Sequence, residues 1–413
     1  MREAKPGQPI ISRRALLSAG GAGLAAAWAP AFACAGGDLR PRDAIAAELV
    51  PLIDSGRLAG AVWEVRRHGR KISAGAAGLA DMARAVPMRE DMIFQIMSTS
   101  KVVIAVAIEM LRARGKVDLD APVGDYLPEF RDQWLLRDSA SQTRLLVRPA
   151  RASRVGDLLA HSSGLPDAPP NVGRFAVKLR YSLAELAGIM SQQPLEYEPG
   201  ARYDYSNVGI AVAARIVEVV SGMPYERFVR DNILSPLGLE RMGFRIAPGD
   251  ERRVPGAYRF ASGLHPLTDK GPGDGDFRFR RGARYVLPEA GLYATAAELA
   301  TLFQGFLDDL LDGKARLLPR QNWHEMLRPR LPITDRDAVV RTRQGLGWRI
   351  AAVDGGSTEG AMGRAGSFGH SGALGSTAWI DAKAGLVAVL MIQTIPGAEA
   401  RAAFARGIMK LTG

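Results

Sequence analysis

Apolar and polar residues recur with two different periods along this chain, and these periods predict where its helices and strands lie. Apolar residues at helical spacing predict a helix over 38–58. Two runs typical of strands, 60–65 and 70–74, flank the pair His68-Gly69 and predict a β-hairpin. The folded part of the chain is therefore expected to begin with one helix and one hairpin.

An unbroken apolar run, residues 102–108, directly follows the sequence Met97-Ser98-Thr99-Ser100-Lys101. This order predicts a helix that starts at Ser98 and is stopped after Arg114 by a glycine. Ser98 and Lys101 are three residues apart, so they lie on the same helical face, where hydroxyl and amine can meet. The sequence thus places a serine and a lysine side by side at the start of an apolar helix.

The middle of the chain has helical periodicity, and its last third returns to strands. Helices separated by Pro and Gly are expected over 154–161, 183–192, 208–221 and 225–233. Residues 246–290 are rich in Gly, Pro and Arg and are predicted to form a long irregular lid or binding loop. Further on, a helix over 295–309, strands over 346–351, 367–370, 377–380 and 386–393, a turn over 381–385 and a helix over 398–411 are expected.

Strands near both ends with helices between them indicate that the two ends share one sheet. The expected organisation is an α/β (α+β) sheet domain formed by residues 36–116 and 291–413, with an inserted all-α lobe at 117–290 that includes the long loop. No internal repeat interrupts this pattern.

Residues 1–35 have the features of an export signal. Ser12–Leu17 contains adjacent arginines, a Gly/Ala-rich apolar stretch follows, and Ala31 and Ala33 form an A-x-A cleavage pattern. The segment resembles a twin-arginine signal peptide, so the protein is expected to be exported to the bacterial periplasm. An uncleaved N-terminal anchor is the alternative, and no later stretch approaches the ~20 apolar residues of a membrane span.

Composition and charge narrow the class of protein. The chain has 413 residues, of which 47% are hydrophobic and 23% charged, as in an ordinary globular enzyme. Its formal net charge of +11 falls to +8 without residues 1–35, which carry four basic residues and one acidic residue, so attraction to anionic surfaces is expected. No dense basic run with interleaved aromatic residues is present, and a nucleic-acid partner is not expected.

The cysteine and histidine positions argue against a disulfide or a metal centre. Cys34 is the only cysteine, so it cannot form an internal disulfide, although cleavage just before it would leave a cysteine open to lipidation. The histidines lie at 68, 161, 265, 324 and 370, without metal-ligand spacing. No metal and no cofactor are therefore predicted.

Three short motifs carry candidate chemistry. The Ser98–Lys101 pair is the only Ser-x-x-Lys in the chain, and a nearby amine can activate a serine alcohol at the positive end of a helix. Tyr205-Ser206-Asn207 precedes a predicted helix, where the alternative is a packed tyrosine and a capping asparagine. Gly369-His370-Ser371-Gly372 lies at a strand end, where the N–H of Ala373 would be able to face an acyl oxygen.

In this order, the three motifs resemble those of the penicillin-recognising serine hydrolases. The resemblance is to the branch that holds class C β-lactamases, D-Ala-D-Ala carboxypeptidases and family VIII carboxylesterases. It extends over nearly the whole chain after residue 35, with further matching segments at 157–165, 203–209, 234–239 and 291–295. It implies a β-lactamase/transpeptidase-like fold, in which an antiparallel sheet is flanked by helices.

The resemblance also implies a role for each motif residue. Ser98 would be the nucleophile, Lys101 its activating partner, and Tyr205 the base that also protonates the leaving group. Asn207 would hydrogen-bond the substrate or Lys101. The backbone N–H groups of Ser98 and Ala373 would form the oxyanion hole, beside a substrate-binding strand end formed by residues 370–372.

The third motif departs from the Lys-Thr-Gly usual in β-lactamases of this branch, because His370-Ser371-Gly372 stands in its place. A histidine is mostly neutral near pH 7, so efficient binding of a β-lactam carboxylate is not expected. The segments 379–381 and 391–393 are more similar to family VIII esterases. The predicted function is a carboxylesterase for small or medium acyl esters.

Several alternatives to this function stay open. The enzyme would otherwise be a D-alanyl-D-alanine carboxypeptidase or a weak β-lactamase, or the chain a non-catalytic cell-wall or penicillin-binding protein. The expected partner is a small ester, amide or peptidoglycan-like substrate, with membrane contact only through the signal segment or a lipid on Cys34. A conventional α/β-hydrolase is rejected, because its elbow-like segment 365–369 needs a later catalytic histidine and none follows His370. His161 is expected to be structural.

Overall fold

The computed structural model describes residues 43–138, 144–167, 179–267, 280, 282–313, 315–334, 340–354 and 363–413. These residues belong to one compact unit that starts at Gly36. The predicted signal segment, with Cys34, lies outside the described residues.

The centre of the unit is a large, mainly antiparallel sheet. Its strands run in the order β10-β11-β12-β13-β14-β15-β1-β2-β3. Their bounds are β1 Gly60–Arg67, β2 Arg70–Asp81, β3 Val86–Pro87, β10 Leu331–Thr334, β11 Val340–Gln344, β12 Arg349–Ala351, β13 Phe368–Ser371, β14 Gly375–Asp381 and β15 Leu386–Ile395. Early strand β1 pairs with late strand β15, with Val62 opposite Met391. This pairing confirms that the two ends of the chain share one sheet.

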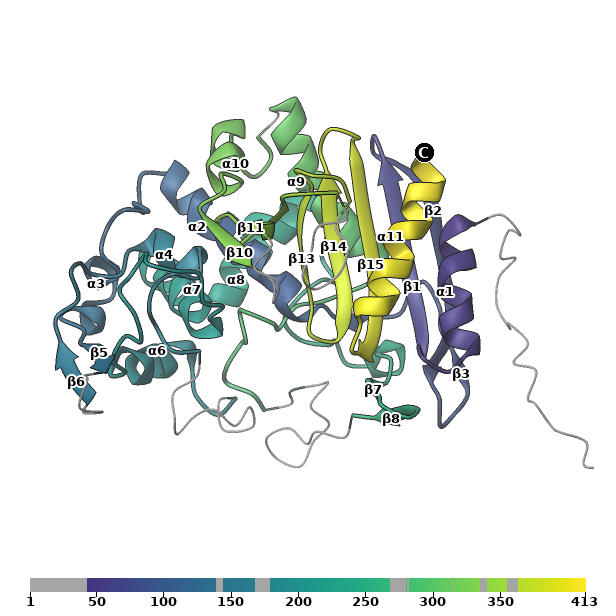
Figure 1. The fold of residues 1–413 in the computed structure, drawn as a ribbon, viewed down its shortest axis with the longest axis horizontal. Helices are drawn as coiled ribbons and strands as arrows, with labels where there is room; N and C mark the ends of the chain where they lie inside the picture. The colour runs from purple at the N-terminus through teal and green to yellow at the C-terminus, as the bar shows by residue number, and fades with distance from the viewer. Residues whose placement is uncertain are drawn as a thin grey trace, which may run out of the picture. The chain divides into compact units, whose positions relative to one another are not determined.

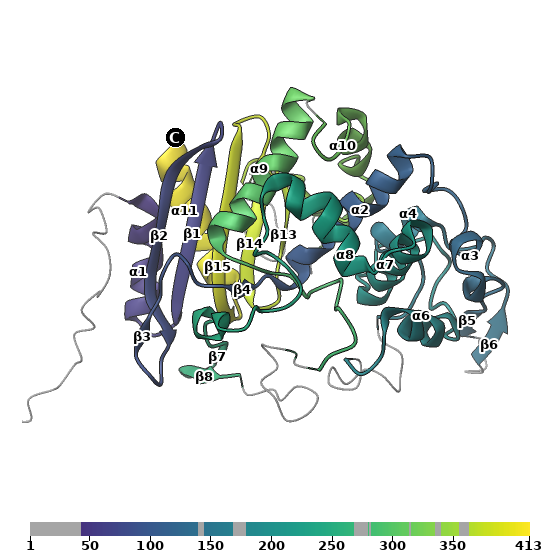
Figure 2. The same cartoon turned by 180° about the vertical axis from the view of Figure 1, so that it is seen from behind.

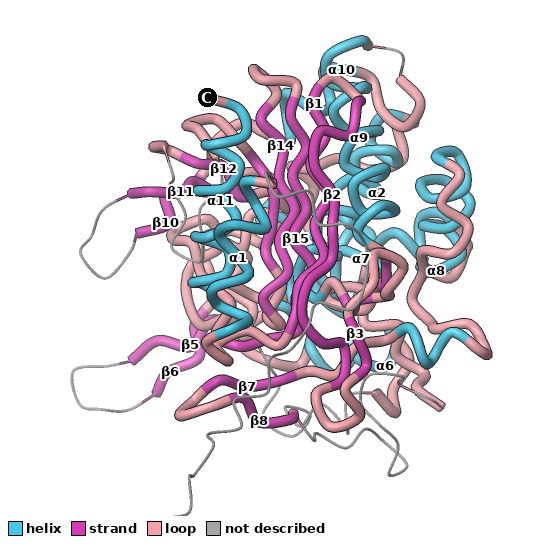
Figure 3. Tube along the Cα trace, turned by 90° about the vertical axis from the view of Figure 1, so that its right-hand side faces the viewer, coloured by secondary structure: helices cyan, strands magenta, loops and turns pink. Residues whose placement is uncertain are grey.

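Helices cover both faces of the sheet (Figures 1 and 3). On one face lie α1 Ala44–Asp54 and α11 Ala398–Thr412, which pack against each other and enclose a core cluster with Trp63 and Trp379. On the other face, α9 Ala296–Asp312 packs on β1, β14 and β15. The helix predicted over 38–58 is described from Ala44 to Asp54. Asp43 precedes it and accepts hydrogen bonds from its first N–H groups.

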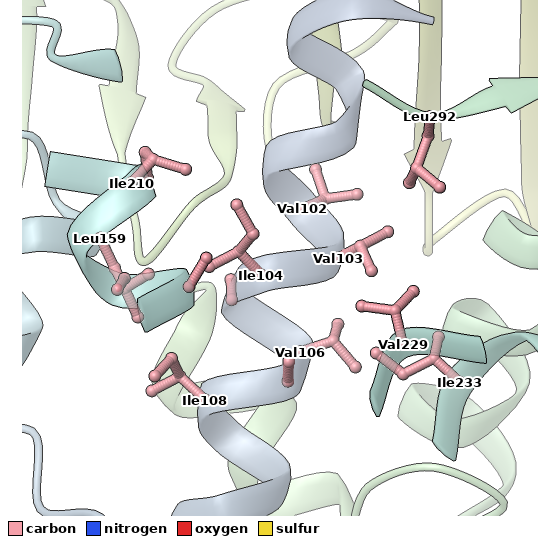
Figure 4. Packing of buried hydrophobic residues seen from close by; sticks show 14 of the residues in the cluster. Val102, Val103, Ile104, Val106, Ile108, Leu159, Ile210, Val229, Ile233 and Leu292 are labelled. Carbon is pink, nitrogen blue, oxygen red and sulfur yellow. The ribbon is translucent and has the colours of Figure 1, made fainter. Parts of the chain in front are cut away.

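Helix α2, Lys101–Ala113, runs through the largest hydrophobic core. Its residues from Lys101 to Leu111 are all buried, and all of them except Lys101 and Glu109 are apolar, as expected of a helix inside a core. Figure 4 shows its valines and isoleucines packed against Leu159, Ile210 and other side chains from neighbouring elements. Each such buried aliphatic side chain stabilises the fold by about 1.5–3 kcal/mol, so α2 is a firmly held support for the residues at its start.

The inserted lobe contains the predicted helices, seen from behind in Figure 2. The predicted ones are α4 Val155–Leu159, α6 Leu183–Ser191, α7 Asn207–Ser221 and α8 Tyr225–Val229. The lobe also contains the short helix α3, Val123–Tyr126, which was not predicted. Helix α7 starts where the Ser206 hydroxyl accepts from the Gly209 N–H at 3.0 Å and ends at Gly222, which has a φ of +70°. None of the helices in the described ranges is apolar and long enough to cross a membrane alone; α7 and the helical segment from Tyr225 pass that test only together, across a 78° bend.

The prediction of an all-α lobe was wrong, because the lobe also contains two strand pairs. Strand β5, Leu135–Asp138, pairs with β6, Arg144–Val147, and β7, Tyr258–Phe260, pairs with β8, Leu264–Pro266. Each strand has only three or four residues, too few for a clear period of two. Helix α10, Arg320–Met326, the edge strand β10 and its neighbour β11 are also short and were not predicted.

The segment predicted as a long irregular loop, 246–290, is partly ordered against the sheet. Its strand β7 extends the sheet by pairing with the end of β15 in parallel, with Tyr258 opposite Thr394. The segment also contains a short 3₁₀ helix, Asp250–Arg253. The stretches 268–279 and 281, where a lid was expected, lie outside the described residues.

Candidate active site

Ser98 and Lys101 lie at the junction between a short strand and the buried helix α2. Strand β4, Phe94–Gln95, leads into a 3₁₀ turn, Met97–Ser100, and α2 begins at Lys101. Met97 has a φ of +49°, an uncommon conformation for a residue with a β-carbon, and it turns the partly exposed Ser98 out of the core. The buried Lys101 Nζ donates to Ser98 Oγ at 3.1 Å. The predicted serine–lysine contact is therefore present.

Lys101 is held by a second oxygen from a distant segment. Its Nζ also donates to the backbone carbonyl of Glu289 at 2.9 Å, and the Glu289 carboxylate accepts from Tyr285 Oη at 2.8 Å. Arg280 braces this segment by donating to the carbonyls of Phe244, at 2.7 Å, and of Gly291. No periodic pattern predicts these contacts, because they join residues far apart in the chain.

Tyr205 is the third predicted residue that the fold brings to this place. Lys101 Nζ lies 4.9 Å from the centre of the Tyr205 ring. The ring centre lies 4.6 Å from that of His161 and 6.4 Å from that of His370. Tyr205 is thus surrounded by Lys101, His161 and His370, which come from separate parts of the chain.

His161 holds the backbone on both sides of Tyr205. Its carbonyl accepts from the Asp204 N–H at 2.8 Å, and its Nδ1 accepts from the Ser206 N–H at 3.2 Å. Burial lowers the pKa of His161 well below 6.5, and the charges of Lys101 and Arg349 lower it further. The ring is therefore neutral, with its proton on Nε2, and fixes the position of Tyr205 as the predicted structural role requires.

His370 is buried and neutral as well. Its Nδ1 lies 2.9 Å from the Ser371 carbonyl oxygen, which can only accept, so Nδ1 carries the proton and Nε2 has a free lone pair. Among the described residues, Nε2 has no hydrogen-bond partner. Burial is the main cause that lowers the pKa of His370 well below 6.5, followed by the charges of Arg349 and Lys101.

The end of strand β13 lies directly against the segment that carries Ser98. A β-carbon at Gly372 would stand 2.5 Å from the Ile96 carbonyl oxygen, so only glycine fits there. The neighbouring Ser371 hydroxyl contacts that of Thr377 at 3.1 Å. Ala373 is exposed, and within the described part of the chain its N–H donates to no backbone carbonyl. This N–H is open to an external acceptor, as is that of Ser98, which has no intrahelical acceptor in the first turn.

Asn207 begins helix α7, and its side chain is directed to a carboxylate. Its backbone N–H donates to Asp167 Oδ1 at 2.6 Å and its side-chain Nδ2 to the same oxygen at 3.1 Å. Asp167 was not singled out from the sequence. The contact of Asn207 with Lys101 or substrate stays a prediction.

Arg349 is a further charged group that sequence reasoning missed. It lies on β12, is only 6% exposed, and places its guanidinium carbon 5.4 Å from the centre of the Tyr205 ring. An arginine within the predicted strand 346–351, otherwise apolar apart from glycine, was the available signal. The site therefore has a permanent cation close to the position where the lysine of the Lys-Thr-Gly motif is missing.

The profile of the Beta-lactamase family matches residues 45–410. The chain belongs to this β-lactamase family. It is 30% identical over 369 residues to esterase EstB of Burkholderia gladioli. This match covers 82% of this chain and 86% of EstB. It is 27% identical to a putative D-alanyl-D-alanine carboxypeptidase of Escherichia coli, over 67% of this chain and 62% of the relative.

A solved structure has the same fold as this chain. EstCE1, described as a hydrolase with promiscuous acyltransferase activity, superimposes with a TM-score of 0.73 at 24% identity and covers 90% of this chain and 98% of its own. The predicted family and the β-lactamase-like fold are confirmed, and the chain is a serine hydrolase. No group of three His, Cys, Asp or Glu side chains that would hold a metal occurs within the ranges described above.

Proposed function

We propose that this β-lactamase-family hydrolase is a carboxylesterase for small or medium acyl esters, which forms an acyl-enzyme on Ser98. The observation that carries the proposal is the 3.1 Å contact between Lys101 Nζ and Ser98 Oγ beside the Tyr205 ring. The similarity to esterase EstB supports the same substrate class. The proposed site is completed by Asn207, His370, Ser371 and Gly372 on the substrate side.

In the proposed reaction, Tyr205 acts in its phenolate form and accepts the Ser98 proton, while Lys101 orients the hydroxyl and stabilises the negative charge that develops. Ser98 Oγ then attacks the acyl carbon, and the N–H groups of Ser98 and Ala373 stabilise the oxyanion. The bond to the leaving alcohol breaks, and Tyr205 returns the proton to that alcohol. A water molecule repeats the sequence on the acyl-enzyme and frees the acid.

The neutral His370 favours esters over β-lactams as substrates. A β-lactam antibiotic carries a carboxylate, which a cation at the third motif would bind by a charge-assisted hydrogen bond. His370 is buried with a lowered pKa and supplies no such charge near pH 7, so a β-lactam carboxylate would have to rely on Arg349 instead. A simple ester has no carboxylate, so a histidine in place of the lysine does not weaken its binding.

A D-alanyl-D-alanine carboxypeptidase is the second candidate, and Arg349 is the observation that favours it. The substrate of such an enzyme ends in a carboxylate, and a buried guanidinium 5.4 Å from the Tyr205 ring is a suitable partner. The similarity to a putative carboxypeptidase points the same way.

One activity panel separates the candidates: p-nitrophenyl acetate and butyrate, a D-Ala-D-Ala peptide, and nitrocefin. The esterase proposal expects kcat/KM for the esters to exceed that for the other two. A faster reaction with the peptide would establish the second candidate instead. Absence of all three activities in a well-folded protein would favour the non-catalytic alternative.

Arg349→Gln tests the carboxylate partner separately. If Arg349 binds a substrate carboxylate, kcat/KM should fall roughly ten- to a hundred-fold for an ester whose leaving group carries a carboxylate. The amide-capped, uncharged form of the same ester should change little. Arg343→Gln, at an exposed arginine on the neighbouring strand β11, is the matched control. Equal losses on both esters would exclude this role.

We also propose that the protein is exported through residues 1–35 and acts in the periplasm. The adjacent arginines and the A-x-A pattern support the proposal. Replacing Arg13 and Arg14 by lysines should retain the protein in the cytoplasm, as measured by cell fractionation. Unchanged export of the double variant would contradict a twin-arginine signal.

A further inference from the structure

The β5–β6 hairpin of the lobe has one face turned inward and one face turned out. Leu135 pairs with Val147, and Leu136 pairs with Leu146. Because side chains alternate along a strand, Trp134, Leu136 and Leu146 share the outer face. Leu135 and Val147 share the inner face, where both pack against the hydrophobic core. The inner face anchors the hairpin and leaves an apolar outer face.

The outer face exposes large apolar side chains that a folded chain normally buries. On this face Trp134 is 44% exposed and Leu146 is 54% exposed. Leu145, which pairs with Arg137 and so lies on the opposite face of the hairpin, is 46% exposed as well. Nine large hydrophobic residues are exposed in the described ranges, and these three belong to one hairpin while the other six come from separate segments. Such a concentration on one small element indicates contact with another surface.

The exposed Trp134 lies on a strand segment that hydrogen bonds hold in place. The Trp134 carbonyl accepts from the Leu195 N–H at 2.7 Å, and the Leu136 N–H donates to the Leu195 carbonyl at 2.8 Å. The Arg148 guanidinium stacks on the Trp134 ring, with its carbon 3.8 Å from the ring centre, and donates to the Asp132 carbonyl. The indole is therefore held in place on the outer face.

The segment that forms this hairpin carries more basic than acidic residues. Residues 131–148 contain four arginines and two aspartates, an excess of two positive charges. Arg144 lies 3.9 Å from Asp138, and Arg137 lies 3.4 Å from Glu198, but both pairs are exposed and therefore weak. The hairpin therefore has basic side chains next to exposed apolar ones.

We propose that the outer face of β5–β6 docks on the surface of a bilayer that contains anionic phospholipid. Tryptophan prefers the level of the lipid headgroups, and leucine the acyl boundary below it. Arg144 and Arg148 flank Trp134 and Leu146, and are placed to meet lipid phosphates. Charge complementarity thus selects an anionic bilayer as the partner of this apolar face.

This contact differs from the two other membrane links considered for the chain, the signal segment and a lipid on Cys34. Figures 1 and 2 place β5 and β6 at the end of the lobe away from the sheet and from helices α1 and α11. Docking through this hairpin requires neither cleavage nor lipidation, and it is independent of the proposed esterase activity.

Vesicle co-sedimentation of the full chain tests the proposal, with residues 1–35 present in every variant. Vesicles of phosphatidylglycerol and phosphatidylcholine are compared with phosphatidylcholine alone. Trp134→Ser/Leu146→Ser and Arg144→Gln/Arg148→Gln should each weaken binding to the anionic vesicles roughly tenfold. Val219→Ser/Leu311→Ser removes two exposed apolar side chains elsewhere and should leave binding unchanged.

Hydrolysis of a soluble ester, or the thermal unfolding curve if no ester is turned over, shows that each variant is folded. Tryptophan emission of the wild type should shift to shorter wavelength with anionic vesicles and not in the Trp134 variant. Equal vesicle binding by wild type and both hairpin variants would overturn the proposal. So would a concentration-dependent dimer that the hairpin substitutions abolish without any effect on vesicle binding.

Discussion

The surroundings of Ser98 and the β5–β6 hairpin depart from the usual placement of polar and apolar groups in opposite ways. Near Ser98, charged and polar groups are buried: Lys101 is 0% exposed and His370 is 1% exposed. On the hairpin, Trp134 and Leu146 are large apolar residues in contact with solvent. Both arrangements cost free energy of folding, by desolvation in the first case and by unburied apolar area in the second.

The two regions therefore differ in what a substitution should change. Residues near Ser98 are placed for chemistry, so their loss should lower activity and leave the free energy of unfolding equal or higher. Residues on the hairpin are proposed to meet a membrane, so their loss should change neither activity nor folding. The predictions below test this distinction, from the largest expected effect to the smallest.

Ser98→Ala should lower hydrolysis of the best substrate about a thousand-fold or more, because no nucleophile remains. The thermal unfolding midpoint should stay nearly unchanged, since the partly exposed hydroxyl adds little to packing. Ser367→Ala is the matched control, because Ser367 is buried and its hydroxyl lacks a hydrogen-bond partner among the described residues. Full turnover by Ser98→Ala would reject the proposed mechanism.

Lys101→Met should lower kcat about a hundred-fold or more while stability stays equal or rises. The substitution removes the amine next to Ser98 Oγ, and it also removes a charge from a site of 0% exposure. Enzyme kinetics and urea unfolding measure the two effects on the same preparation. Lys116→Met, at an exposed lysine, should change neither. A matching loss of stability would instead assign Lys101 a mainly structural role.

His161→Ala should lower kcat roughly ten- to a hundred-fold with a smaller change in KM, because Tyr205 loses both the stacked ring and the acceptor for the Ser206 N–H. His161→Asn should restore part of the loss, since asparagine tolerates the φ of +55° and offers a side-chain acceptor. The pH profile of kcat should shift in the alanine variant. An equal fall in kcat and unfolding midpoint in both variants would mean that His161 acts on stability alone.

The smallest expected effect is on acid stability. His370 and His161 have pKa values lowered in the folded state, so below about pH 6.5 the unfolded chain binds more protons and stability falls as the pH falls. Each histidine contributes a slope of up to about 1.4 kcal/mol per pH unit. His370→Gln should reduce the slope of unfolding free energy between pH 6.5 and 5. An unchanged slope would show that His370 is charged in the folded protein.

The sequence by itself determined the family, the main helices and the sheet strands β1, β2 and β12 to β15. The apolar run at 102–108, with a helix start before it and a glycine after Arg114, predicted a buried helix. The order of Ser98-x-x-Lys101, Tyr205-x-Asn207 and His370-x-Gly372 carried the resemblance. These features are local, since they depend on residue types and spacing within a few positions.

Only the tertiary structure decided which groups from distant segments contact the site residues. The Glu289 carbonyl on Lys101, the Arg349 guanidinium near Tyr205 and the Asp167 carboxylate on Asn207 come from segments far apart in the chain. No periodicity relates such residues, because long-range contacts follow from the packing of whole elements. Short strands β5 and β6 were likewise decided by contacts with Leu195 and the core, since four residues have too little intrinsic preference to form a hairpin alone.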